Sequence, residues 1–137
     1  MMKQLSVFVE NKPGSLMRVT SELNEANVSI KAISSFDTPD FGILRMIVDD
    51  IQTAKKCLEA NGMLARIQSI VAVELEDKKG ALNSLLNILY DNNININYIY
   101  SMVIRDGKMP LMILYSEENE KMESVLNKHS FKIVDNL

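Results

Sequence analysis

The polar residues best placed to bind a small molecule lie in the turn "ENKPGSLMRV" at 10–19, which follows a short apolar run. Asn11 supplies an amide, Pro13 fixes the backbone, and Gly14 lets the backbone approach a guest closely. Ser15 offers a hydroxyl where a helix is predicted to begin. The unpaired N–H groups of that first helical turn carry partial positive charge, so the turn is suited to a carboxylate.

A carboxylate at an exposed helix start contributes only about 0.3–1 kcal/mol, and roughly 2 kcal/mol when it is partly buried. Useful affinity therefore needs a second group. The side-chain carbonyl of Asn11 can accept a hydrogen bond from an ammonium group. Because a carboxylate together with an ammonium group describes an amino acid, the turn predicts an amino-acid site.

A second turn, "EDKKGALNSL" at 76–85, has the same plan behind another apolar run. In this turn Asp77 is the polar acceptor at the position of Asn11, and Gly80 is at the position of Gly14. A purely structural alternative is that glycine and proline only end a strand and start a helix. The recurrence of the turn favours the binding interpretation.

The other residues able to do chemistry are isolated. Cys57 is the single cysteine, so an internal disulfide is excluded. His129 is the single histidine, which excludes paired-histidine zinc sites. We expect Cys57 to be a packed thiol and His129 to precede a terminal strand, with no catalytic role, no metal and no cofactor.

Composition excludes several classes of partner. The chain has 137 residues, 47% of them hydrophobic, and a formal charge of −3. That balance provides no broad basic surface for nucleic acid or for anionic lipid. The start lacks the apolar stretch of a secretory signal, and no run of about 18 apolar residues is present. We expect a cytoplasmic protein that contacts neither nucleic acid nor membrane.

An internal repeat extends well beyond the two turns. Residues 5–35 align with 71–101 at an offset of sixty-six, with ten identities in thirty-one positions. Other pairs, such as Val28 with Ile94 and Val19 with Leu85, exchange one apolar residue for another. The chain is therefore a duplicated unit.

Hydrophobic periodicity predicts the same elements in each copy. Alternating apolar residues predict a strand, and apolar residues spaced three and four apart then predict a helix. Two strands, a second helix and a closing strand follow. In the first copy these are a strand at 5–9, a helix with the apolar stripe Leu16–Val19–Leu23–Ala26, strands at 28–36 and 42–48 joined by a turn at 37–40, a second helix around Leu58, and a closing strand at 64–69. In the second copy they are a strand at 71–75, a helix with the apolar stripe Leu82–Leu85–Leu86–Leu89, a turn at 105–107, a second helix around Val125, and a closing strand at 131–134.

This order predicts an α+β fold of two tandem ferredoxin-like βαββαβ domains, residues 1–69 and 70–137, each with an antiparallel sheet and its helices on one face. After one inserted residue, Leu111, Ile113 and Tyr115 correspond to Leu44, Met46 and Val48, and this set is predicted to face the helices. The opposite set, Ile43, Ile47, Met112 and Leu114, is apolar too, so both faces of each sheet are expected to be buried. The copies are then expected to share an interface.

The stretches "VFVENKPGSLMRVTSELNEANVSI" and "VELEDKKGALNSLLNILYDNNININYIYS" resemble the opening of an ACT domain. This small-ligand regulatory module is attached to many enzymes of amino-acid metabolism. Together the two copies cover nearly the whole chain, which is similar to proteins made of two ACT domains. The resemblance implies a non-catalytic sensor whose amino-acid effector binds between adjacent domains at the first turn.

The resemblance also assigns site residues. The ligand-contacting turn of the family falls on Asn11, Lys12, Pro13, Gly14, Ser15 and Leu16, and in the second copy on Asp77, Gly80, Ala81 and Leu82. A polar position at the start of the second strand falls on Ser29 and Asn95. Lys79 stands where the family has proline and Asp77 where asparagine is usual, so we expect the first site to be the stronger one.

Three other functions compete with this interpretation. The module could act only through protein contacts, with another copy or as a regulatory partner of an enzyme such as acetolactate synthase. We expect the chain to form a homodimer and to act with an enzyme of amino-acid metabolism. An acylphosphatase-like phosphate cradle is disfavoured because Arg18 falls inside the helix and its counterpart is Ser84. RNA binding is disfavoured because the central stretch "VAVEL" carries no aromatic residue.

Overall fold

The computed structural model describes residues 1–102 and 109–137. The predicted turn at 105–107 lies outside the described residues. The chain divides into two compact units, one of Lys3–Gln68 and one of Ser69–Leu137 together with Met1–Met2. The two units share the strand β4, whose first residues belong to the first unit and whose last belong to the second.

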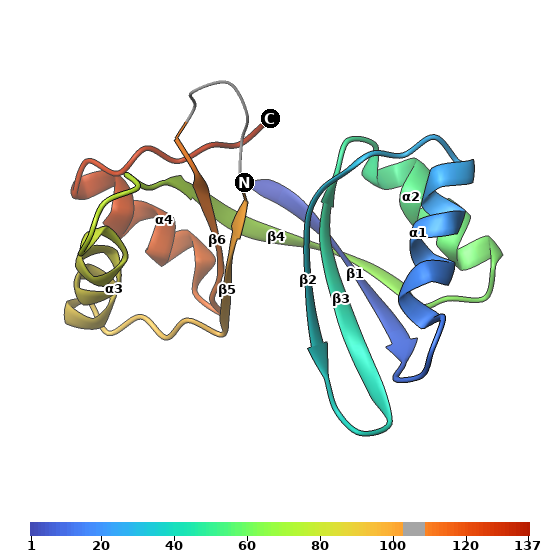
Figure 1. Cartoon of the computed structure of the whole chain (residues 1–137). Coiled ribbons are helices and arrows are strands. Elements are labelled where there is room, and N and C mark those ends of the chain that lie inside the picture. Colours follow the sequence, from blue (N-terminus) through green and yellow to red (C-terminus); the bar gives the residue numbers. More distant parts are fainter. Residues whose placement is uncertain (103–108) are drawn as a thin grey trace. The chain divides into compact units, whose positions relative to one another are not determined.

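In the first unit the helices α1 and α2 cover one face of an antiparallel sheet (Figure 1). The strand order is β2-β3-β1, with β4 beside β1. The elements are β1 (Met2–Glu10), α1 (Ser15–Glu25), β2 (Ile30–Asp37), β3 (Phe41–Val48), α2 (Ile51–Ala60) and β4 (Ala65–Glu74).

Strand register places the core of this unit between sheet and helices. Leu5 pairs with Met46 and Val7 with Leu44. Because side chains alternate between the two faces of a strand, these four share one face. They pack in a single buried cluster with residues of both helices, which include Val19, Leu23, Ala54 and Leu58.

The second unit repeats the plan with α3 (Ala81–Asp91), β5 (Tyr98–Met102), β6 (Leu111–Tyr115) and α4 (Asn119–Lys128). Its sheet has the order β4-β6-β5. Val73 bridges to Ile133, and Val134 donates a backbone hydrogen bond to Ala72. The predicted closing strand at 131–134 is therefore reduced to a single bridge with flanking hydrogen bonds.

The predicted facing of β6 was wrong. Val73 pairs with Met112 and Val71 with Leu114, and the core cluster contains Leu114 with Met112 packed against it. The copies thus differ by two inserted residues rather than one. A slip of one residue moves every side chain of a strand to the opposite face, which explains the error.

The helix stripes were predicted too wide at their first turn. Leu23 and Leu89 are fully buried, whereas Leu16 is 47% exposed and Leu82 is 41% exposed. Leu16 and Leu82 therefore lie at the edge of the core rather than within it. Leu86 is exposed as well.

Both helices that follow the repeated turns also end alike. Asn27 and Asn93 adopt left-handed backbone with φ of 59° and 56°. The residue after each, Val28 and Ile94, donates its N–H back to a buried leucine of the helix, Leu23 or Leu89. Asparagine tolerates this conformation better than most residues, so the chain reverses toward the next strand at the same point in each copy.

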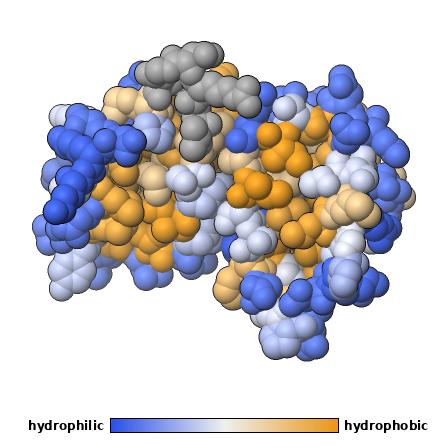
Figure 2. Space-filling model, in the orientation of Figure 1, coloured by the Kyte–Doolittle hydropathy of each residue, from blue (hydrophilic) through white to orange (hydrophobic). Residues whose placement is uncertain are grey.

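The first unit exposes several large apolar side chains away from its core. Phe8 pairs with Ile43, and Ile43 pairs with Phe36, so the three form a row on the sheet face opposite the helices. Phe36 and Phe41 are about half exposed, and the rings of Phe8 and Phe41 lie 6.4 Å apart. Figure 2 shows apolar surface over β2 and β3.

Candidate ligand-binding site

The two repeated turns have the same backbone conformation. Gly14 and Gly80 have φ of 88° and 89°, in the left-handed region that glycine adopts without strain. Lys12 donates its N–H to Glu10, and Lys78 donates its N–H to Glu76. The lysine and glutamate side chains also pair, at 3.0 Å in the first turn and 2.6 Å in the second. The sequence repeat therefore specifies one loop, built twice.

Neither helix behind these turns is capped by its own side chains. Gly14 and Gly80 occupy the N-cap positions, and the first turns of α1 and α3 contain no acidic residue. Ser15 accordingly lies inside the helix instead of capping it. By contrast, α2 is capped by Asp50, whose carboxylate accepts hydrogen bonds from the Thr53 amide and hydroxyl. The positive ends of α1 and α3 therefore carry no carboxylate of their own.

Asn11 is oriented by the hairpin beside it. Its side-chain amide donates to the Thr38 carbonyl at 2.9 Å, and its backbone N–H donates to Asp40. The Nδ2 group is thereby engaged, which leaves the Oδ1 atom as the acceptor end of the side chain.

The predicted residues of the first turn lie on an open surface. Asn11, Lys12, Pro13, Gly14 and Leu16 are exposed, and Ser15 is half-buried. A Cβ atom added to Gly14 would meet nothing within 4 Å. The turn therefore has free space around its closest-approach position.

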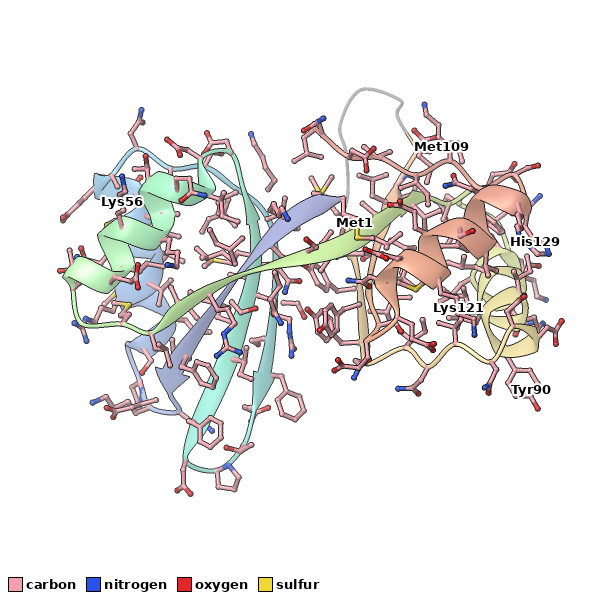
Figure 3. The ribbon with its side chains drawn as sticks, turned by 180° about the vertical axis from the view of Figure 1, so that it is seen from behind. Met1, Lys56, Tyr90, Met109, Lys121 and His129 are labelled. Carbon is pink, nitrogen blue, oxygen red and sulfur yellow. The ribbon has the colours of Figure 1, made fainter. Side chains whose placement is uncertain are left out.

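The second turn borders a cavity of about 430 Å³ within its own unit. Gly80 and Ala81 line it, as do Ser84 of α3 and the segment His129–Lys132 that follows α4. Figure 3 shows His129 at the end of α4, with Met109 on the same side of the unit. Ligand pockets commonly measure roughly 300–1,000 Å³, so this volume suits a small metabolite.

Charged groups of both signs surround an apolar wall in this cavity. The wall is formed by Leu75, Met109 and Phe131. The rim contains the lysines Lys78, Lys79 and Lys132 and the glutamates Glu74 and Glu76. Lys132 pairs with Glu74 at 3.2 Å. Three lysines against two glutamates leave one net positive charge when His129 is neutral.

The remaining predicted residues lie apart from this cavity. Asp77 and Leu82 belong to the same turn but are exposed outside the lining, and Asn95 is exposed ahead of β5. Ser29 lines a separate open groove with Thr20, Ser21 and Asn24. Because α1 has 11 residues and rises about 1.5 Å for each, Ser29 lies about 16 Å along the helix from the turn of its own unit.

Sequence reasoning missed the segment His129–Lys132 and the role of Ser84. The segment corresponds to Asn61–Leu64 at an offset of sixty-eight. Phe131 donates its N–H to Leu126 just as Met63 donates to Leu58, both at 3.0 Å, and Ser130 and Gly62 both have positive φ. The apolar run at 131–134 was assigned only to a strand, so its place beside the turn was not foreseen.

Arg18 and Ser84 differ at the same point of the two units. Arg18 lies on an exposed part of α1, and its guanidinium donates to the Asn61 carbonyl at 2.8 Å. It therefore spans from α1 to the end of α2. Ser84 occupies the equivalent position on α3, and its short side chain lines the cavity instead.

The single cysteine and the single histidine lie in different units. Cys57 donates to the Glu22 carbonyl, and burial raises the pKa of its thiol, with Glu22 and Glu25 adding to the shift. His129 belongs to the other unit and lies against the Val125 carbonyl. Within 1–102 and 109–137 no three His, Cys, Asp or Glu side chains are grouped to hold a metal. No helix of those ranges is long and apolar enough to cross a membrane.

A family profile described as an ACT domain pair matches residues 1–137. The chain belongs to the ACT domain pair family. This confirms the predicted resemblance and the predicted α+β fold. The profile accounts for both units and leaves no described residue to another kind of domain.

Solved structures resemble this ACT domain pair over most of its length. Protein BT0572 from Bacteroides thetaiotaomicron is 32% identical, with a TM-score of 0.88, and the alignment covers 97% of this chain and 91% of that one. The ligand-free regulatory subunit of aspartate kinase from Thermus thermophilus is 16% identical, with a TM-score of 0.64 and coverage of 92% and 91%.

A third structure, E. coli aspartokinase III in complex with lysine and aspartate, is 16% identical with a TM-score of 0.53. The alignment covers 93% of this chain but only 31% of that enzyme. At these identities the two kinase structures show a shared fold. The search of curated proteins gave no match.

Proposed function

We propose that this ACT domain pair is a non-catalytic regulatory protein that binds an amino acid at its repeated glycine turns. The observation that carries the proposal is the pair of uncapped helix starts, each preceded by a left-handed glycine and an exposed polar acceptor, Asn11 or Asp77. Main-chain N–H groups there suit a carboxylate, and the acceptor suits an ammonium group.

Two findings support this proposal. The cavity beside the second turn has the size of a metabolite site and carries both cationic and anionic groups. The similar fold of a protein described as the regulatory subunit of aspartate kinase supports a regulatory role for this chain. Our working hypothesis is therefore that the effector is an amino acid and that the regulated partner is an enzyme of amino-acid metabolism.

Thermal unfolding against the twenty amino acids tests the proposal directly. A ligand that binds only the folded state stabilises it by about 2.7 kcal/mol at a hundredfold excess over its dissociation constant. Lysine and aspartate are the first compounds to test, because the E. coli aspartokinase III complex contained them. We expect one or a few amino acids to raise the melting temperature, and no response to any of them would contradict the proposal.

Matched variants then locate the effect. We expect Gly14→Val or Gly80→Val to weaken binding at its own turn, because a β-branched residue strains a positive φ and fills the space in front of the helix. Calorimetric titration of both variants reports which turn is used. Full affinity in both variants would rule out the turns as the site.

A protein-interaction module is the second candidate, and the row of Phe8, Ile43 and Phe36, in which both phenylalanines are exposed, favours it. Apolar side chains grouped on one face commonly mark contact sites. Sedimentation velocity would show whether a second copy covers the row, as a homodimer requires. Replacing Phe36 by Ser should then shift the protein toward monomer, whereas an amino-acid sensor that does not use this face would keep its ligand response.

A further inference from the structure

We infer that the cavity of the Ser69–Leu137 unit is a binding site for an amino acid with an apolar side chain, and that Ser84 keeps it open. This inference rests on the proposed function and assigns its ligand class and its location within one unit. The lining joins α3 to the segment after α4, so the site needs no element from the Lys3–Gln68 unit.

The lining divides into two parts with different chemistry. The rim can bind a carboxylate through its lysines, which are Lys78, Lys79 and Lys132. It can also accept hydrogen bonds from an ammonium group through Glu74 and Glu76. The wall of Leu75, Met109 and Phe131 offers neither donor nor acceptor side chains. A zwitterionic head with an apolar tail matches both parts, whereas a second charged group would face the apolar wall.

The first unit shows how the same place can be spanned by a side chain. Arg18 reaches the Asn61 carbonyl at 2.8 Å, and Asn61 corresponds to His129 in the second unit. An arginine at position 84 would extend along the same path, across the space between α3 and the end of α4. The short side chain of Ser84 therefore leaves this space open in the second unit, whereas Arg18 bridges it in the first.

The electrostatics also favour a ligand that brings a carboxylate. Glu74 and Glu76 each pair with one lysine, Lys132 and Lys78, while Lys79 takes part in no ion pair within the described residues. The rim therefore holds one cation more than its own carboxylates balance. A ligand carboxylate completes this balance at modest desolvation cost, because the rim is exposed to solvent.

Calorimetric titration of the full chain tests the inference with named probes. We expect L-leucine, L-methionine or L-phenylalanine to bind at least about tenfold more tightly than L-aspartate or glycine, because only they fill the apolar wall. The deaminated analogue 3-phenylpropionate should bind about tenfold more weakly than L-phenylalanine, because it offers no ammonium group to the glutamates.

Two variants locate the site. Ser84→Arg should abolish binding of the amino acid that the wild type prefers, while the matched control Ser84→Ala should retain its affinity. Position 84 is exposed on a helix, and arginine is a better helix former than serine, so Ser84→Arg should fold. Arg18→Ser, the reciprocal change in the first unit, should leave this affinity unchanged.

The outcomes separate the inference from the proposed function. Equal binding of an amino acid to the wild type and to a folded Ser84→Arg variant overturns the location but leaves amino-acid sensing standing. Tighter binding of L-aspartate than of L-leucine, L-methionine and L-phenylalanine overturns the ligand class. If no amino acid binds the wild type, both the inference and the proposed function fail.

Discussion

The two units have the same backbone conformation at their repeated turns but differ in the side chains beside those turns. Each has a glycine of positive φ, an uncapped helix behind it and a Lys–Glu pair across the turn. In the first unit Arg18 reaches the end of α2, and in the second Ser84 lines a cavity. The two copies therefore share their main-chain geometry at the turn and differ in the side chain at the equivalent position of the helix, Arg18 or Ser84.

The largest effect should come from the buried leucines that the two copies share. Leu23→Ala and Leu89→Ala each remove a fully buried side chain and should each cost about 2–5 kcal/mol of unfolding free energy. Urea unfolding monitored by circular dichroism measures both. Leu16→Ala and Leu82→Ala are matched controls, and should change stability by only about 0.5 kcal/mol because these leucines are already nearly half exposed in the folded state. A control as costly as its buried partner would show that the first helical turn is part of the core.

A smaller effect is expected at the turn glycines. Alanine at Gly14 or Gly80 meets no atom within 4 Å, so its cost of about 1–2 kcal/mol comes from left-handed backbone alone. Because φ is nearly the same in both turns, the two costs should agree. Chemical denaturation of Gly14→Ala and Gly80→Ala measures this. A marked difference between the two would show that the turns are not equivalent in solution.

The second helices of the two units differ at their N-caps. Asp50 caps α2 through Thr53, whereas Glu118 at the equivalent position of α4 makes no capping bond. We expect Asp50→Ala to lower the melting temperature at neutral pH and Glu118→Ala to change it little. Thermal melts of the two variants at one pH provide the comparison. Equal effects would show that the Asp50 cap contributes nothing.

The cap also predicts a pH dependence. Hydrogen bonds from the Thr53 side chain and amide lower the pKa of Asp50 below its ordinary value of 3.8. A carboxyl with a lowered folded-state pKa contributes stability above its unfolded pKa and loses it as the pH falls through the folded value. The gap between wild type and Asp50→Ala should therefore be full at pH 6 and shrink below about pH 3.8. A gap that does not change with pH would contradict the assignment.

The smallest effect on stability should follow from removing the Arg18 side chain, which spans from α1 to the end of α2 in the first unit. Arg18→Ser removes an exposed hydrogen bond to the Asn61 carbonyl and should cost less than about 1 kcal/mol. Denaturation measures the cost, and calorimetric titration shows whether the opened unit gains a second amino-acid site. A cost of several kcal/mol would mean that Arg18 holds α1 against α2 rather than only spanning the space between them.

Much of this architecture could be predicted because local rules decide it. Alternating apolar residues specify a strand such as β1, and a glycine between an apolar run and a helix specifies the turn at Gly14. The repeat adds weight, since the same elements recur at Gly80. These features depend on neighbours a few residues away in the chain, and they were predicted with their order intact.

The errors and omissions arose where distant parts of the chain meet. The side of β6 that faces the helices depends on its pairing with β4, and a single extra residue between the strands reversed it. The cavity depends on the approach of His129–Lys132 to Gly80, which lie about fifty residues apart. The amino-acid sequence by itself determined the elements, their order and the two turns, because backbone conformation follows local chemistry. Only the tertiary structure decided what lies beside each turn, because Arg18 reaches the end of α2 and Ser84 lines the cavity through contacts between residues far apart in the chain.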